Sequence, residues 1–226
     1  MAFRKKYHKL LVSNPDIIVI QESENKEKLV QFLDGVDYKQ ILWFGDNPHK
    51  GVAIIGFNNY QIQLHDKYNP EYKYVIPLTI QADKELIHLF AIWAMPHSTD
   101  KSKSYVGQVW NSIHYYKQEL KTKSILIGDF NSHVRWDTER HPGNHSGVVA
   151  FLKDLNIHSC YHHFYQIEQG QELDSTWYMY KHADKSYHLD YCFASACLIK
   201  DMTIEIGRFD DWIALSDHLP LIINFS

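Results

Sequence analysis

One ten-residue stretch, Ser124–His133 (SILIGDFNSH), constrains the fold of this 226-residue chain more than any other. Its apolar run Ile125–Ile127 predicts a buried strand. Asp129 and Asn131 follow two residues apart, so in extended backbone they point to one side while Phe130 turns back into the core. Open α/β sheets commonly place their chemistry at such a strand end. The alternative is an ordinary turn, since Gly-Asp and Asn-Ser are common turn formers.

Two other acidic residues lie at or near predicted strands and favour a site over a turn. Glu22 ends the apolar run 16–21, although it could instead be a solvated residue before a helix that Ser23 caps. Asp190 lies at the centre of the predicted strand Ser186–Ser195. A carboxylate inside an apolar strand is expensive to bury unless it is paired, so Asp190 requires a partner.

Loop residues next to the last strand and one earlier strand complete the polar set. Asp217 and His218 stand immediately before the closing strand, Leu221–Phe225, and as neighbours they face different partners within one site. His97 follows the predicted strand Glu85–Ala94, where it is either a phosphate ligand or proton donor, or an ordinary loop residue.

Aromatic and basic side chains near these positions are candidates for substrate binding. The polar loop 135–146 contains Trp136 and Arg140, and an arginine with aromatic company suits a phosphate and a base. A surface loop without a role is the alternative. Trp177 lies in a predicted aromatic strand, where it could stack on a base.

Composition narrows the class of protein. A net charge of −4 argues against a strongly basic nucleic-acid binder, but it leaves room for a cleft neutralised by metal ions. The three cysteines form no metal-type spacing and leave an odd thiol, which favours a reducing, cytoplasmic location. No stretch approaches the ~20 apolar residues of a membrane span, and no linker divides the chain, so we expect one domain over residues 1–226. Strands, a helix and more strands in sequence predict a mixed α/β chain with much antiparallel sheet.

The polar residues share one chemistry. Carboxylates near the ends of separate strands, with an Asn and a His, suit Mg²⁺ or Mn²⁺, because these ions prefer oxygen ligands and keep open positions. Clustered carboxylates repel one another, and a divalent cation relieves that repulsion. Phosphoester hydrolysis needs such a cation, an acid that orients or deprotonates water, and a cationic His on the developing charge.

Four short motifs carry a resemblance to a known family. They are IVIQE (18–22), IGDFN (127–131), HLDY (188–191) and SDHLP (216–220). In this order and spacing the chain resembles the endonuclease/exonuclease/phosphatase superfamily, which includes abasic-site endonucleases, deoxyribonucleases, sphingomyelinases and inositol-polyphosphate phosphatases. The resemblance covers nearly the whole chain and implies an α/β fold, a four-layer α/β/β/α sandwich of two packed mixed sheets with outer helices.

The resemblance also implies roles for individual residues. Glu22 matches the metal-binding glutamate, and Asp217 matches an aspartate near the metal, Mg²⁺ or Mn²⁺. Asp129 matches the aspartate that orients or activates the attacking water, and Asn131 its partner on the phosphate.

Asp190 matches the aspartate that positions the active-site histidine, His218, and this pairing would explain an acid within a strand. His97 falls where relatives have a His or Tyr that reaches the phosphate. Relatives usually begin with a strand ending in Trp-Asn, whereas this sequence begins at the following helix. We therefore expect that first strand to be missing from the sequence.

Three functions remain open. The first is a metal-dependent phosphodiesterase acting on DNA or RNA, an endonuclease or exonuclease, for which Trp136, Arg140 and Trp177 would contact the substrate. The second is a phosphatase or phosphodiesterase of small or lipid phosphoesters, although no membrane-inserting apolar hairpin is evident. The third is a non-catalytic binding module. We expect a monomer.

Overall fold

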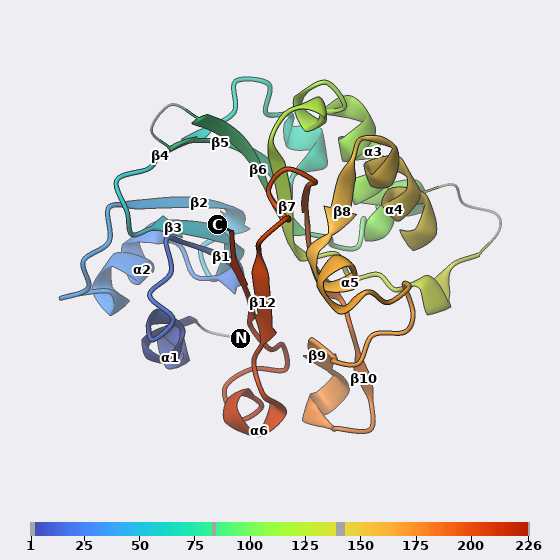
Figure 1. Ribbon diagram of the computed structural model, residues 1–226. Helices are drawn as coiled ribbons and strands as arrows, with labels where there is room; N and C mark the ends of the chain where they lie inside the picture. The colour runs from blue at the N-terminus through green and yellow to red at the C-terminus, as the bar shows by residue number, and fades with distance from the viewer. Residues whose placement is uncertain (1–2, 83–84, 139–142, 226) are drawn as a thin grey trace.

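The computed structural model describes residues 3–82, 85–138 and 143–225, and it contains two main β-sheets (Figure 1). The smaller sheet is antiparallel with the order β1-β3-β2, formed by Ile17–Ser23, Lys50–Gly56 and Gln40–Asn47. The larger sheet has the order β4-β5-β6-β7-β11-β8, formed by Gln61–Leu64, Val75–Ala82, Glu85–Trp93, Ser124–Asp129, Asp190–Ser195 and Ile157–Ser159. Its β6 and β7 run parallel and its other neighbours run antiparallel, so the larger sheet is mixed.

Short strand pairs and helices complete the fold. The pairs are β9 with β10 and β12 with β13, formed by Trp177–Tyr178, Ser186–Tyr187, Thr203–Ile206 and Leu221–Asn224. The α-helices α1 to α6 are Tyr7–Leu11, Lys26–Phe32, Val106–Tyr115, His145–Asp154, Cys160–Tyr165 and Phe209–Trp212. The 3₁₀ turns η1 to η6 are Phe3–Lys5, Pro70–Tyr72, Lys101–Lys103, Glu119–Lys121, Val134–Trp136 and Met179–Lys181. Within the described ranges, none of the helices has the length and apolar character to cross a membrane.

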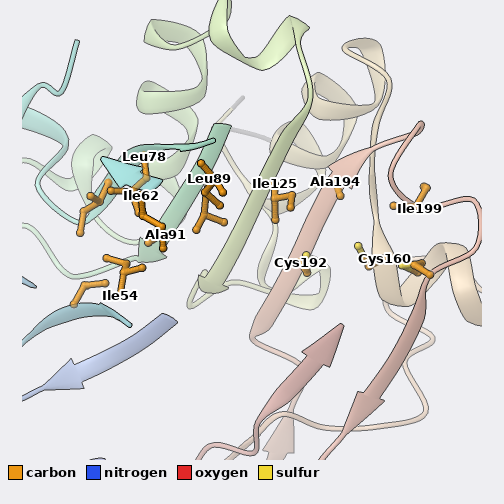
Figure 2. Close-up of a cluster of buried hydrophobic side chains, with 14 of the residues drawn as sticks. Ile54, Ile62, Leu78, Leu89, Ala91, Ile125, Cys160, Cys192, Ala194 and Ile199 are labelled. Atoms are coloured by element: carbon orange, nitrogen blue, oxygen red, sulfur yellow. The ribbon is translucent and has the colours of Figure 1, made fainter. Parts of the chain in front are cut away.

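Alternation along β6 shows how the larger sheet divides the core. Leu89 and Ala91 face a cluster shared with the smaller sheet, and Figure 2 shows Ile54 of β3 in that cluster. Phe90 and Ile92 face the opposite way, into a cluster with α3 and α4. A third cluster lies between the smaller sheet and the N-terminal helices. Apolar contacts thus join helices to one sheet, that sheet to the other, and the second sheet to further helices.

The expected arrangement of layers is therefore met in part. The larger sheet is mixed as expected, but the β1-β3-β2 sheet is antiparallel. Two local expectations are wrong. Asn25, not Ser23, caps α2, because its side chain accepts a hydrogen bond from Lys28 N at 3.3 Å. Asp190 is the first residue of β11 and does not lie at the centre of a longer strand.

Candidate active site

The carboxyl end of β7 brings Asp129 next to Asp190. In the strand register Asp129 faces Trp93 of the parallel neighbour β6 and Asp190 of the antiparallel neighbour β11. Phe130 is fully buried and its ring centroid lies 5.6 Å from that of Tyr191, as the sequence predicts. Side chains from three strands therefore converge where β7 ends.

Asn131 fixes the Asp129 carboxylate. Its backbone N–H donates to Asp129 Oδ1 at 2.9 Å, and its side-chain Nδ2 donates to Asp129 Oδ2 at 2.8 Å and to Ala94 O at 2.9 Å. The pair meets as predicted but by another route, since Asn131 has a left-handed backbone with φ of 46° and is not extended. Both amide hydrogens of Asn131 thus have acceptors within the protein.

Asp190 and His218 form the predicted pair. His218 Nδ1 donates to Asp190 Oδ2 at 2.9 Å, so the other ring nitrogen is left for a substrate. Thr176 Oγ1 accepts from Asp190 N at 2.9 Å and holds the start of β11 in place. Burial lowers the pKa of His218, but the charge and hydrogen bond of Asp190 outweigh it, and together with the charge of Asp129 they raise the pKa to about 9.

The surroundings also shift the pKa of Asp129. Burial raises the pKa of Asp129 and the charge of Asp190 raises it further, to about 7, against the opposing effects of His218 and the Asn131 N–H. The site therefore pairs an imidazole that keeps its proton with a carboxyl that titrates near neutrality. Such a difference in pKa between neighbouring groups is characteristic of acid–base sites.

Glu22 ends in an ion pair. It is the second-last residue of strand β1, with a left-handed φ of 56°, and its Oε1 is 2.8 Å from Lys50 Nζ. Burial raises the pKa of Glu22, but several opposing effects, among them the hydrogen bond and the charge of Lys50, together hold the pKa below its usual range. Asp217 is close enough to His218 for its charge to raise the histidine pKa.

Two of the three candidate substrate-binding residues, Trp136 and Trp177, lie in a row of aromatic rings. Trp136 is 46% exposed and its ring lies 4.8 Å from Tyr187, whose ring in turn lies 6.2 Å from Trp177. Trp177 is 6.3 Å from the ring of His218, so these rings form a row that ends at the site. Arg140 lies outside the described residues.

His97 is placed in an exposed loop. Its Nδ1 accepts from the backbone of Asp100 at 3.0 Å, so the ring organises its own loop. No described contact joins His97 to Asp129 or His218, and its role in the site remains a prediction.

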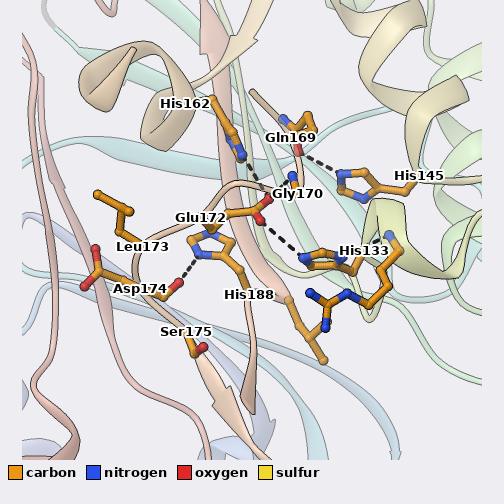
Figure 3. Close-up of polar contacts among 12 residues, drawn as sticks. His133, His145, His162, Gln169, Gly170, Glu172, Leu173, Asp174, Ser175 and His188 are labelled. Carbon is orange, nitrogen blue, oxygen red and sulfur yellow. Dashed lines mark hydrogen bonds and ion pairs between the residues drawn. The ribbon is translucent and has the colours of Figure 1, made fainter. Parts of the chain in front are cut away.

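A buried polar cluster beside the site was not predicted (Figure 3). Glu172 receives His133 Nε2 at 3.2 Å on one oxygen and His162 Nε2 at 3.0 Å on the other. Burial raises the pKa of Glu172, but these two hydrogen bonds and those from backbone N–H groups together hold the pKa far below its usual range. Burial also lowers the pKa of His188, to about 4, and its Nδ1 lies 2.9 Å from Asp174 O. His133 and His188 lie in stretches quoted above, but Glu172 and His162 do not, so only the tertiary structure reveals the cluster.

The donor chemistry of the site suits a hard divalent cation. Glu22 and Asp217 offer oxygen ligands. Burial and, after it, the charge of Asp190 raise the pKa of Asp129, and a cation would offset that negative charge. The arrangement is not that of a formed metal site, because within residues 3–82, 85–138 and 143–225 no three His, Cys, Asp or Glu side chains are grouped to hold an ion.

Comparison with known proteins gives no matching family model and no matching curated sequence. Solved structures do match. The AP endonuclease LMAP from Leishmania major has a TM-score of 0.69 at 13% identity, over 99% of this chain and 82% of that one. The 3'-5' exonuclease NExo from Neisseria meningitidis has a TM-score of 0.67 at 16% identity, over 100% and 96%.

A third match is an endonuclease/exonuclease/phosphatase from Beutenbergia cavernae, with a TM-score of 0.59 at 14% identity over 97% of this chain and 64% of that one. The Neisseria protein has also been solved bound to a product DNA hairpin. Identities this low speak for the fold and not for the activity. The chain therefore has the endonuclease/exonuclease/phosphatase fold.

Proposed function

We propose that this chain is a divalent-metal-dependent phosphodiesterase that cleaves nucleic acid, acting as a cytoplasmic monomer. The observation that carries the proposal is the convergence of Asp129, Asp190 and His218, with an imidazole pKa of about 9 beside a carboxyl pKa of about 7. Hydrolysis of a phosphodiester needs a base toward water and a cation toward the phosphate at the same time. Between these two pKa values Asp129 is ionised while His218 keeps its proton.

Each residue then has a defined task. Asp129 accepts a proton from the attacking water, and Asn131 holds its two oxygens in a fixed orientation. His218 donates a hydrogen bond from Nε2 to a phosphate oxygen, while Asp190 keeps the ring oriented and charged. Glu22 and Asp217 would hold Mg²⁺ or Mn²⁺, which when bound polarises the phosphate and offsets its charge.

The row of aromatic rings supports nucleic acid as the substrate class. Trp136, Tyr187 and Trp177 lead from an exposed ring to His218, and Arg135 lies over the Tyr187 ring at 6.0 Å. Rings arranged in this way can stack on bases of any sequence, and an arginine among them suits the backbone phosphate. A structural relative is bound to DNA, which is consistent with this choice.

The test is hydrolysis of labelled single-stranded, duplex and abasic DNA, RNA, and bis-p-nitrophenyl phosphate, with Mg²⁺, Mn²⁺ or EDTA. We expect cation-dependent cleavage of a polynucleotide, with a loss of about a hundredfold or more in Asp129→Ala and His218→Gln. Asp154→Asn, an exposed carboxylate at the end of α4, is the matched control and should cleave normally.

Other outcomes would overturn the proposal. Turnover of bis-p-nitrophenyl phosphate with every polynucleotide intact would favour a hydrolase of small phosphoesters. Polynucleotide binding without any turnover would favour a binding module.

A further inference from the structure

One carboxylate of the site, that of Glu22, is already paired with a lysine. Lys50, the first residue of β3, places its ammonium 2.8 Å from Glu22 Oε1. The same ammonium lies 5.3 Å from the centre of the Trp93 ring, and Trp93 is the strand neighbour of Asp129. Lys50 is thus held by an anion and an aromatic face at the edge of the site.

A second lysine approaches from the N-terminal segment. Lys6 precedes α1, and its Nζ donates to Ser216 Oγ at 3.3 Å. Ser216 is the neighbour of Asp217 in the loop that also carries His218. The pKa of Lys6 is lowered, because burial outweighs the charges of Asp190, Asp217 and Glu22, which raise it.

We propose that Lys50 competes with the divalent cation for Glu22 and so sets the affinity of the site for metal. This inference rests on the metal site of the proposed function. A cation that binds Glu22 must displace the Lys50 ammonium from Oε1 or share the carboxylate with a like charge.

The exposure of both side chains allows a cation to displace Lys50 from Glu22. The Lys50 side chain is 47% exposed and Glu22 42% exposed, so the lysine can turn toward water when a cation arrives. An exposed ion pair contributes little stability, so exchange is not costly to the fold. The lysine therefore acts as a replaceable internal cation.

The experiment measures Mn²⁺ binding without substrate, by the electron paramagnetic resonance of free Mn²⁺, on the full chain at low ionic strength. Lys50→Met replaces the lysine by an unbranched apolar side chain and removes the charge, and we expect it to lower the Mn²⁺ dissociation constant about tenfold. Lys50→Gln should act in the same direction. Lys50→Arg retains the charge and should stay within about twofold of the unchanged chain.

Lys73→Met is a matched control. Lys73 makes the same two kinds of contact elsewhere, an ion pair with Asp46 and a position 5.3 Å over the Tyr74 ring. Its replacement should leave Mn²⁺ binding unchanged. A gain equal to that of Lys50→Met would reveal a general charge effect and overturn the inference.

A double mutant tests whether Lys50 and the cation compete for Glu22. Glu22→Gln should weaken Mn²⁺ binding, and adding Lys50→Met to it should give little further tightening, because the contested carboxylate is gone. Unchanged affinity in Lys50→Met, full tightening in the Glu22→Gln background, or no Mn²⁺ binding by any variant would each overturn the inference. A chain that binds Mn²⁺ as expected yet cleaves nothing would refute the proposed function alone.

Discussion

At the scale of single residues, the site is governed by how charge is distributed over a few buried groups. Asp190 is the residue on which both unusual pKa values depend, because its charge raises the pKa of His218 and that of Asp129. The charge of Asp190, at the start of β11, thus keeps His218 protonated and brings the pKa of Asp129 close to neutral pH.

Removing the charge of Asp190 should lower the pKa of His218. In Asp190→Asn, burial is left as the main effect, so we expect the pKa of His218 to fall from about 9 to below its usual range. Titration of the imidazole followed by NMR measures this directly. Asp184→Asn removes an exposed carboxylate and should leave the titration unchanged. A His218 that still titrates near 9 without Asp190 would refute the assignment.

The raised pKa of His218 also affects the stability of the fold. The folded-state pKa of His218 lies above its ordinary value of 6.5, so the pair stabilises the fold below about pH 6.5 and this stabilisation is lost as pH rises through about 9. The shift corresponds to roughly 3 kcal/mol. We expect the free energy of unfolding in chelator to fall over this range, and His218→Gln to remove most of that fall.

At the scale of elements, the close approach of β6 and β7 positions Asp129. Gly128 has a φ of 140°, and a Cβ at this position would lie 2.0 Å from Ile92 O of β6. Ile92 and Gly128 are partners in the parallel register, one residue before Trp93 and Asp129. The glycine therefore allows the two strand ends to lie level with each other.

Gly128→Ala should accordingly be severe. We expect a loss of roughly 3 kcal/mol in the free energy of unfolding, because backbone has to move apart to admit the methyl group. Gly35→Ala is the matched control, since Gly35 also has a positive φ, of 79°, but nothing lies within 4 Å of its Cβ position. It should lose roughly 1 kcal/mol. Urea denaturation measures both losses. Equal losses would show that the positive φ alone, and not the contact with Ile92 O, accounts for the destabilisation.

Elements with a clear apolar period could be predicted, and those defined by tertiary partners could not. The run that became β7 and the buried Phe130 followed from the sequence. Helix α5 did not, because its residues CYHHFY are aromatic and favour a strand by local preference. The ion pair of Glu22 with Lys50 depends on an irregular register between β1 and β3, which no periodicity discloses.

At the scale of the whole molecule, the cluster around Glu172 ties separate segments together. His133 follows β7 and His162 lies in α5, and both bind one carboxylate in the loop before β9. Gly170 N donates to the same carboxylate at 2.9 Å. One buried anion thus joins the segment after Asp129 to the helix that follows β8, the edge strand of the larger sheet.

Glu172→Gln should weaken the whole fold. A carboxamide can accept from only one of the two imidazoles, so we expect a loss of roughly 2 kcal/mol in the free energy of unfolding at pH 7. Because the folded pKa of Glu172 is lowered, its stabilisation is present above its ordinary pKa of 4.5 and is lost as pH falls below that value. The difference between the two chains should shrink there.

Glu168→Gln changes an exposed glutamate in the same loop and serves as the control for this measurement. It should leave the free energy of unfolding unchanged. Thermal unfolding at several pH values gives the comparison, and a Glu172→Gln chain as stable as the original would show that the cluster is dispensable.

The order of the site residues along the chain bears on how the molecule folds. His218 and Asp190 are 28 residues apart, and Asp190 in turn meets Asp129 only through the pairing of β11 with β7. Long loops close slowly, so these contacts form after the local helices and hairpins. During refolding, the contacts of His218 with Asp190 and of Asp190 with Asp129 should therefore return later than helical circular dichroism, and a partly folded chain would carry every candidate site residue without the assembled site.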